Sequence, residues 1–347
     1  MSAGRIVICG AQVPFAHGGA EMLVESLRGE LAARDFEVDV VTLPFHWPTR
    51  VELLKSALAW RLVNLTESAG KRIDRVIATR FPSYLVKHPN KVVWLVHQLR
   101  QIYDLLGTPY SDFADQPRDR MVVEMIRDMD RRTLSEARAV FTISHNVAER
   151  LRRNNEVAAE VLHPPPRLAG RLYCGDFGDY VFSVSRLDRL KRFDLLIRAL
   201  RHTETAVRVR IAGKGPEHDA LSELAARLGV AERVDLLGWV GDDDMVRHFA
   251  GAGGVFFAPY DEDYGYVTVE AFKAGKPVVT TADAGGVLEF VEDGINGYVC
   301  NPDSPREIAT RLDRLFRDRH LARTLGAAGQ AKVKSIGWDQ VVASLTA

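Results

Sequence analysis

Residues 255–280 read VFFAPYDEDYGYVTVEAFKAGKPVVT, and this stretch decides the fold class of the chain. Residues 255–258 form a short apolar run that is typical of a buried strand. Residues 267–274 are predicted to be a helix that ends at Gly275, and residues 277–281 resume as a second strand. The stretch therefore predicts a strand–loop–helix–strand unit, in which an acidic loop follows the carboxyl end of the first strand.

The acidic loop and the helix carry two glutamates that stand a short distance apart in the chain. Glu262 lies in the loop and Glu270 in the helix, with seven residues between them. In open parallel sheets, ligands bind outside the carboxyl ends of the strands, which is where this loop would lie. From this stretch alone two interpretations stay open. Either two carboxylates face one ligand, or a solvated acidic turn is followed by an ordinary helical glutamate.

The alternation of strands and helices extends over the whole chain. Further strands are predicted at residues 5–10, 75–78, 92–96, 139–143, 180–186, 207–213 and 234–238, and helices at residues 20–33, 193–201 and 217–229. Such alternation predicts an α/β protein with two doubly wound parallel sheets. Three consecutive prolines at 164–166 cannot lie inside a helix or a central strand, so they mark the domain boundary. We expect domains at residues 1–165 and 166–330, and a tail at 331–347 that returns towards the first domain.

Length and composition support two domains and exclude some kinds of partner. A chain of 347 residues is long for a single core. Lys plus Arg and Asp plus Glu both total 46, so the net charge is zero and nucleic acid is not an expected partner. Cys9, Cys174 and Cys300 are isolated in the sequence, which argues against a disulfide framework or a zinc site.

The sequence predicts a cytoplasmic protein, because it shows neither a signal-peptide core nor an apolar run as long as a membrane span. Residues 51–65 place Val51, Leu54, Leu58, Leu62 and Leu65 on one face of a predicted helix. Core packing is the favoured interpretation of that face. Peripheral contact with the inner face of a membrane, or with a lipid-linked acceptor, is the alternative that stays open.

A Gly-rich turn and a basic pair are further features that suggest a ligand. The first predicted strand is not followed by G-x-G-x-x-G, so the dinucleotide fingerprint fails. Instead, Gly18 and Gly19 open a helix, where bare N–H groups can meet an anion or a sugar, although a flexible turn is the alternative. Arg186 follows a strand and Lys191 precedes a helix, which together suit a doubly charged group such as a diphosphate.

The combined pattern resembles the family 4 glycosyltransferases, which are retaining enzymes of the GT-B fold. The matching segments, in chain order, are GGAE (18–21), Arg186 with Lys191, GKGP (213–216), the E-x7-E pair of Glu262 and Glu270, and GGVLE (285–289). The resemblance implies two Rossmann-like domains that face a cleft, the first binding the acceptor and the second the nucleotide-sugar donor. It also implies a transferase of the kind that builds polysaccharides.

The resemblance also implies a role for each matching residue. Arg186 and Lys191 would hold the diphosphate, Glu270 the ribose hydroxyls and Glu262 the donor sugar. His97, which ends a predicted strand, would face the donor sugar, although a purely structural histidine is the alternative. The remaining donor-binding positions are Gly18, Gly19, Gly213, Lys214, Gly215, Gly265, Gly285 and Gly286. Apart from the resemblance, Arg80, Phe81, Arg100 and Tyr103 could line the acceptor side.

The function that this resemblance implies is transfer of a sugar from a UDP- or GDP-sugar to a hydroxyl of a glycan or lipid-linked acceptor. It would need no cofactor and no metal, although Asp261 and Asp263 resemble the D-x-D pair that holds a metal in the other main transferase fold. A sugar-nucleotide epimerase and a non-catalytic sugar-nucleotide-binding protein are the alternatives. The chain departs from the family at two places, with Asp263 after the first glutamate and Arg192 after the lysine, where a small residue or proline and a glycine are common.

Overall fold

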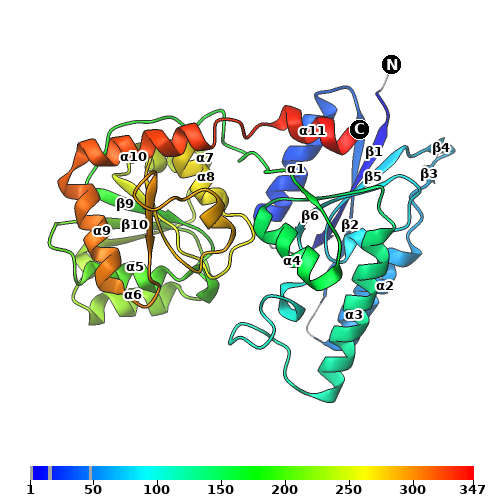
Figure 1. Cartoon of the computed structure of the whole chain (residues 1–347), viewed down its shortest axis with the longest axis horizontal. Coiled ribbons are helices and arrows are strands. Elements are labelled where there is room, and N and C mark those ends of the chain that lie inside the picture. The colour runs from blue at the N-terminus through cyan, green and yellow to red at the C-terminus, as the bar shows by residue number, and fades with distance from the viewer. Residues whose placement is uncertain (1–2, 15–17, 47–48) are drawn as a thin grey trace. The chain divides into compact units, whose positions relative to one another are not determined.

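The computed structural model describes residues 3–14, 18–46 and 49–347, and it divides the chain into two compact units (Figure 1). Unit 1 comprises Met1–Arg167 together with Gly337–Ala347, and unit 2 is Leu168–Ile336. The change of unit follows the three prolines at 164–166. Unit 2 continues through helix α10 (Arg319–Lys332), past residue 330, where the sequence predicted its end.

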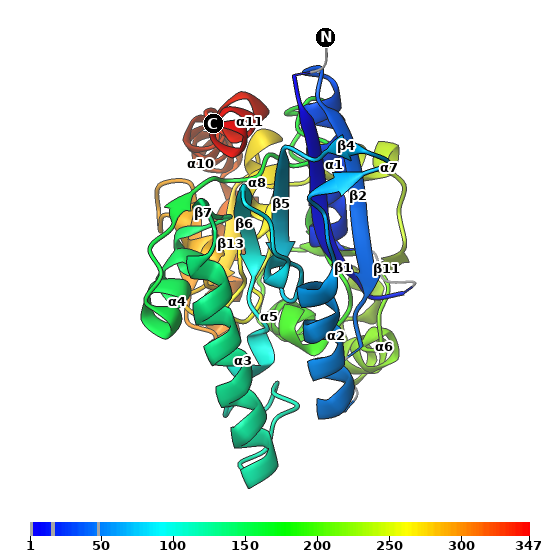
Figure 2. The same cartoon turned by 90° about the vertical axis from the view of Figure 1, so that its right-hand side faces the viewer.

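Unit 1 is built on a six-stranded parallel sheet in the order β2-β1-β5-β6-β7-β8. The strands are β1 (Arg5–Gln12), β2 (Glu37–Pro44), β5 (Arg75–Arg80), β6 (Lys91–His97), β7 (Ala139–Thr142) and β8 (Glu160–Val161). Strands β3 (Glu67–Ser68) and β4 (Lys71–Arg72) form a separate antiparallel pair. Helices α1 (Gly19–Ala32) and α11 (Trp338–Thr346) pack together, whereas α2 (Arg50–Leu62) packs on α3 (Pro117–Ser135), which also contacts α4 (His145–Asn155). Figure 2 shows α2 and α3 side by side.

Unit 2 repeats this architecture with the strand order β11-β10-β9-β12-β13-β14. The strands are β9 (Tyr180–Val184), β10 (Arg208–Ala212), β11 (Val234–Gly238), β12 (Gly254–Phe256), β13 (Val278–Thr281) and β14 (Gly297–Cys300), all parallel. Helices α5 (Phe193–Leu200), α6 (His218–Arg227) and α9 (Pro305–Arg317) pack together, whereas α8 (Tyr266–Lys273) packs on α10. Helix α7 (Asp242–Gly251) connects β11 to β12. The prediction of two doubly wound parallel sheets is confirmed.

The strand order of unit 2 creates a point where the winding reverses. The chain proceeds from β9 outwards to β10 and β11, and then crosses back through α7 to β12 on the other side of β9. Connections that leave neighbouring strands in opposite directions open a crevice at the carboxyl edge, and ligands of doubly wound sheets bind there. In unit 2 this place lies beyond the ends of β9 and β12.

The apolar face predicted for residues 51–65 is not the buried face of helix α2. The helix buries Leu53, Ala57 and Trp60, whereas Leu58 and Leu62 are 53% and 86% exposed. The prediction that this face packs in the core was therefore wrong for Val51, Leu58 and Leu62, because the helix buries Leu53, Ala57 and Trp60 instead. Among the residues that the structure describes, no helix is long and apolar enough to cross a bilayer.

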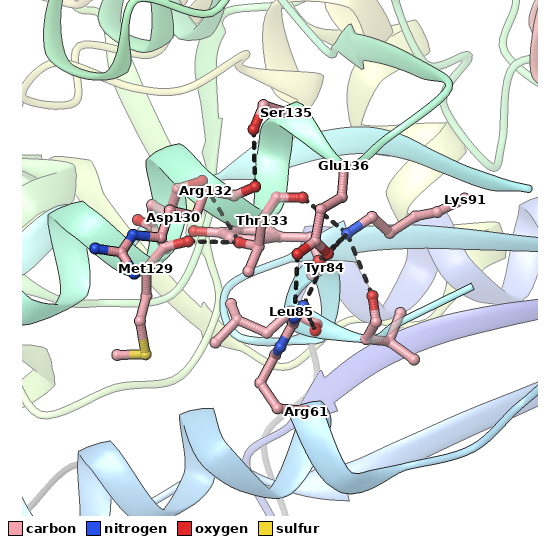
Figure 3. A network of polar contacts seen from close by, with 11 residues as sticks. Arg61, Tyr84, Leu85, Lys91, Met129, Asp130, Arg132, Thr133, Ser135 and Glu136 are labelled. Carbon is pink, nitrogen blue, oxygen red and sulfur yellow. Dashed lines mark hydrogen bonds and ion pairs between the residues drawn. The ribbon is translucent and has the colours of Figure 1, made fainter. Parts of the chain in front are cut away.

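A buried lysine joins four elements of unit 1. Figure 3 shows Lys91 pointing its ammonium group at Glu136, and the side chain of Lys91 has no exposed surface. Its Nζ donates to the carbonyl oxygens of Tyr84 (3.1 Å) and Thr133 (2.8 Å) and lies 3.3 Å from the Glu136 carboxylate. Arg61 of α2 also donates two hydrogen bonds, of 2.8 and 3.0 Å, to Glu136. Buried charges need such partners, and these contacts hold α2, α3, β6 and the turn at Ser83–Leu85 together.

A second buried charge, Asp130 of α3, lies in a chain of hydrogen bonds that reaches the end of β6. The Tyr103 hydroxyl donates to Asp130 (2.8 Å) and accepts from Asn155 (3.0 Å), and Gln98 donates to Asn155. Burial raises the pKa of Asp130 to about 7, although the hydrogen bond from Tyr103 acts to lower it. The loop after β6 is therefore anchored on a carboxyl group that is half protonated near neutral pH.

We predict that Asp130 makes the stability of the protein fall as the pH rises from about 4 to about 7. The unfolded chain loses the Asp130 proton near its ordinary pKa, whereas the folded protein keeps it, so raising the pH favours unfolding. The full effect is at most about 4 kcal/mol, since each pKa unit corresponds to about 1.4 kcal/mol. Urea unfolding of the wild type and of Asp130→Asn at pH 5 and pH 8, followed by the fluorescence of the buried Trp60 and Trp94, measures it.

The stability advantage of the wild type over Asp130→Asn should shrink between pH 5 and pH 8. Asp128→Asn is the control, because Asp128 lies on the same helix with 49% of its side chain exposed. An equal pH dependence in the wild type and in Asp130→Asn would contradict the prediction.

Candidate active site

Two residues of opposite charge meet at the point where the winding of unit 2 reverses. Lys191 ends the short turn η3 (Arg189–Lys191) after β9, and Glu262 lies in the acidic loop after β12. The Lys191 ammonium forms an ion pair with the Glu262 carboxylate, and the two side chains are 15% and 17% exposed. The backbone N–H of Tyr260 also donates to the Leu190 carbonyl (2.8 Å). The segments that follow β9 and β12 are therefore joined by an ion pair and by a backbone hydrogen bond.

Arg186, the other predicted cation, leaves the same strand but points towards solvent. Its side chain is 71% exposed, and its Nη2 lies 3.5 Å from the Asp188 carboxylate. Asp188 in turn accepts a hydrogen bond from the backbone of Leu190 (3.1 Å) and so caps η3. Arg186 is thus next to the Lys191 turn and available to an incoming anion, whereas Lys191 is already paired.

The Gly-rich exit after β10 lies beside the exit after β9. The backbone N–H of Leu187 donates to the Lys214 carbonyl (2.9 Å), which places the segment of Gly213, Lys214 and Gly215 against the residue that follows Arg186. A Cβ on Gly215 would lie 2.3 Å from the Leu187 carbonyl oxygen, so only glycine fits this close approach. The sequence correctly predicted that these exits lie at one edge.

The acidic loop is paired with the segment after β13, which carries Gly285 and Gly286. Glu262 N–H donates to the Ala284 carbonyl (3.1 Å), and Gly286 N–H donates to the Glu262 carbonyl (2.7 Å). A Cβ on Gly286 would lie 2.5 Å from the Asp263 carbonyl oxygen. The small residues here let two backbone segments approach each other, which holds Glu262 in place.

Gly265 has a structural reason of its own. It caps the start of α8 with a φ of 87°, a backbone conformation that residues with a side chain rarely adopt. A Cβ at this position would lie 2.8 Å from Val287 Cγ2. Glu270 follows in α8 and is half-buried. The fold alone therefore accounts for Gly265, and its predicted approach to a donor stays a prediction.

The candidates of unit 1 lie at the carboxyl ends of β1 and β6. His97 ends β6, and its Nδ1 lies 2.7 Å from the carbonyl oxygen of Gln98. Gly18 precedes Gly19, the first residue of α1, and the Gly18 N–H donates to the Glu21 carboxylate (2.9 Å), so one N–H of this helix start is already used. The roles that the resemblance implies for these residues stay predictions.

Two residues expected on the acceptor side are buried instead. Phe81 is 2% and Tyr103 6% exposed, and the Tyr103 hydroxyl is used by Asp130. Arg80 pairs with Glu21 at the start of α1, and Arg100 pairs with Asp104 (2.6 Å). The prediction was therefore wrong for Phe81 and Tyr103, because an apolar ring next to a strand end is as easily part of the core as of a binding surface.

Arg192 and Asp283 form a further contact at this edge, which was not predicted from the sequence. The Arg192 guanidinium forms two hydrogen bonds of 2.7 Å with the Asp283 carboxylate. Burial acts to raise the pKa of Asp283, but hydrogen bonds from Arg192 and Thr281 outweigh it and hold the pKa below its ordinary value. The position of Asp283 in the sequence was the available signal, since it lies two residues after the end of a third strand at the same edge.

Comparison with known proteins identifies unit 2. Residues 178–332 match the family model described as "Glycosyl transferases group 1". Unit 2 is a group 1 glycosyl transferase domain. The chain is 33% identical over 198 residues to a D-inositol 3-phosphate glycosyltransferase of Streptomyces griseus, and 34% identical over 173 residues to one of Nocardia farcinica. These matches cover 53% and 47% of this chain but only 42% and 38% of the relatives, so the chain spans less than half the length of each.

Solved structures resemble the chain over both units. Sucrose-phosphate synthase from Thermosynechococcus elongatus matches 99% of the chain and 97% of its own length, with a TM-score of 0.78 and 18% identity. HepE of Anabaena, in complex with UDP and glucose, matches 99% of both chains with a TM-score of 0.71 and 20% identity. The predicted GT-B fold and the resemblance to glycosyltransferases are thereby confirmed. The group 1 glycosyl transferase domain contains Arg186, Lys191, Glu262 and Glu270.

We predict that Glu262→Gln strengthens binding of a nucleoside diphosphate such as UDP about 3- to 10-fold. The change removes the carboxylate that occupies Lys191 and keeps the size of the side chain, so the ammonium is free for the phosphate oxygens. Isothermal titration of UDP into both proteins measures the change. Glu223→Gln is the control, because Glu223 is exposed on α6. Weaker binding to Glu262→Gln would contradict the prediction.

Proposed function

We propose that the protein is a retaining glycosyltransferase, which moves a sugar from a UDP- or GDP-sugar to a hydroxyl of a glycan or lipid-linked acceptor. The observation that carries the proposal is the Lys191–Glu262 pair at the winding reversal of a group 1 glycosyl transferase domain. This pair sets a cation for phosphate and an acceptor of hydroxyl hydrogen bonds next to each other. A sugar diphosphate presents those two chemical groups next to each other as well.

The donor diphosphate is held by Arg186 and Lys191, and the backbone amides at the Gly-rich exits contribute partial positive charge. As the bond between the sugar carbon and the phosphate oxygen breaks, negative charge grows on the diphosphate, and the two cations stabilise it. The acceptor oxygen bonds to the same face of the sugar carbon, and its proton passes to the departing diphosphate. The configuration at the sugar carbon is therefore retained.

Glu262 accepts hydrogen bonds from the sugar hydroxyls and Glu270 from the ribose hydroxyls. Each such bond to a charged oxygen contributes about 1.5–3 kcal/mol. The acceptor is the least constrained part of the proposal. The relatives that match about half of this chain are named D-inositol 3-phosphate glycosyltransferases. An inositol phosphate is therefore one acceptor to test.

The test of this function is release of UDP or GDP from a panel of donor sugars, with and without glycan and inositol phosphate acceptors. We expect slow release without acceptor and faster release with the correct one, and proton NMR of the product should show the donor's anomeric configuration. Arg186→Ala and Lys191→Ala should lower turnover about 100-fold or more while weakening UDP binding less, because the charge grows as the bond breaks. Arg201→Ala, an exposed change after α5, is the control.

Donor binding with no release under any condition would instead identify a non-catalytic sugar-nucleotide-binding protein. Interconversion of one sugar nucleotide into another would identify an epimerase. An inverted product would contradict the proposed retention.

We further predict that turnover needs no divalent metal. A metal would neutralise the leaving diphosphate, and Arg186 and Lys191 already bring positive charge to it. The measurement is donor turnover by the dialysed protein in excess EDTA, which should stay within about two-fold of the untreated rate. Activity that is lost in EDTA and restored by magnesium or manganese would overturn the prediction. The Asp261→Asn and Asp263→Asn variants would then show whether this D-x-D pair holds the ion.

A further inference from the structure

Arg192 occupies a backbone conformation that is unusual for a long side chain. It connects η3 to α5 directly after Lys191, with φ 50° and ψ 43° in the left-handed region. Only glycine adopts this region freely, since a Cβ crowds the following carbonyl oxygen. A strained backbone of this kind persists only where surrounding contacts fix the conformation. The side-chain contacts of Arg192 show what fixes it here.

The Arg192 guanidinium uses its donors on five hydrogen bonds within unit 2. Two of them reach Asp283 (2.7 Å each), and a third reaches the Thr281 hydroxyl (2.8 Å). The other two reach the backbone carbonyls of Ala258 and Pro259 (2.9 Å each). The side chain is 11% exposed, and all three guanidinium nitrogens donate to protein acceptors.

These acceptors come from the two loops that form the site. Ala258 and Pro259 begin the acidic loop after β12, Thr281 is the last residue of β13, and Asp283 lies in the loop that follows it. The same two segments are joined by the hydrogen bond from Asp261 N–H to the Asp283 carbonyl (2.8 Å). A single guanidinium thus lies where the exits of β9, β12 and β13 meet.

We propose that Arg192 is a positioning residue, which together with Asp283 holds the acidic loop so that Glu262 meets Lys191 before any donor binds. Its effect on turnover rests on the proposed function, whereas its effect on the loop does not. Arg192 acts through Glu262 and contributes no hydrogen bond to the donor. A planar fork is needed for this task, because it bonds a carboxylate and two carbonyls at once.

The first test is hydrogen exchange of the loop in the ligand-free protein. Arg192→Gly keeps the left-handed backbone and removes the guanidinium, so the fold should persist. We expect the backbone amides of Tyr260, Asp261 and Glu262 to exchange about 10-fold faster or more in this variant. Asp283→Asn should show the same change, and Arg198→Ala, whose exposed side chain pairs with Asp194 on α5, should not. Unchanged exchange in both Arg192→Gly and Asp283→Asn would overturn the proposal.

The second test separates positioning from direct binding. Arg192→Gly should lower kcat about 10- to 100-fold without weakening UDP binding, because UDP lacks the sugar that meets Glu262 and a displaced Glu262 leaves the Lys191 ammonium to the phosphate oxygens. Arg192→Lys should fail to restore kcat, since an ammonium cannot replace the fork. The double variant Arg192→Gly with Asp283→Asn should lose about as much as one single change, since both act as one unit.

Equal losses in UDP affinity and in kcat would show that Arg192 binds the donor directly, and would overturn the positioning role. A wild-type protein that turns over no donor would refute the proposed function. The hydrogen-exchange result would then still decide whether Arg192 holds the loop.

Discussion

The Lys191–Glu262 contact depends on the order of strands in the second sheet. Lys191 and Glu262 are 71 residues apart in the chain, yet their strands, β9 and β12, are direct neighbours. Neighbouring strands are about 4.8 Å apart. If the strands followed one another in chain order, β9 and β12 would be separated by about 14 Å, beyond the reach of an ion pair. The reversal of winding is therefore what brings a basic exit and an acidic exit together.

The first unit uses its polar residues differently. Lys91 and Asp130 are buried, and their partners come from the same unit. Arg80 holds the start of α1 through Glu21. Such networks stabilise the positions of strand ends, because an unpaired buried charge would be costly. Lys91, Asp130 and Arg80 therefore act as supports for the strand ends and loops around them.

These two units show why part of the molecule could be predicted from its sequence. The apolar runs at β9, β10 and β12 indicate buried parallel strands, and parallel strands place their carboxyl ends at one edge. Arg186, Lys191 and Glu262 could therefore be assigned to that edge without coordinates. Which face of α2 is buried could not be predicted, because both the buried and the exposed face carry apolar residues.

The arrangement of Arg192 could not be predicted for a different reason. Its partners, Asp283 and the carbonyl of Ala258, are distant in sequence, and no spacing rule links them. An arginine after a strand is also common in loops. Periodicity finds the elements and the edge on which ligands bind, but a side chain that bridges three loops is decided by tertiary packing.

Under the proposed function, the Lys191–Glu262 pair makes the site bind the intact sugar donor more tightly than the nucleoside diphosphate product. An ammonium group has three donors and can turn from Glu262 to the phosphate oxygens. Glu262 would then lie near the diphosphate as a like charge, at a cost of roughly 3–4 kcal/mol at 4–6 Å in partly buried surroundings. Sugar hydroxyls offset this cost by about 1.5–3 kcal/mol for each hydrogen bond to the carboxylate. Once the sugar has been transferred, the offset is lost and the repulsion remains, so the same carboxylate that binds the donor promotes release of the nucleoside diphosphate.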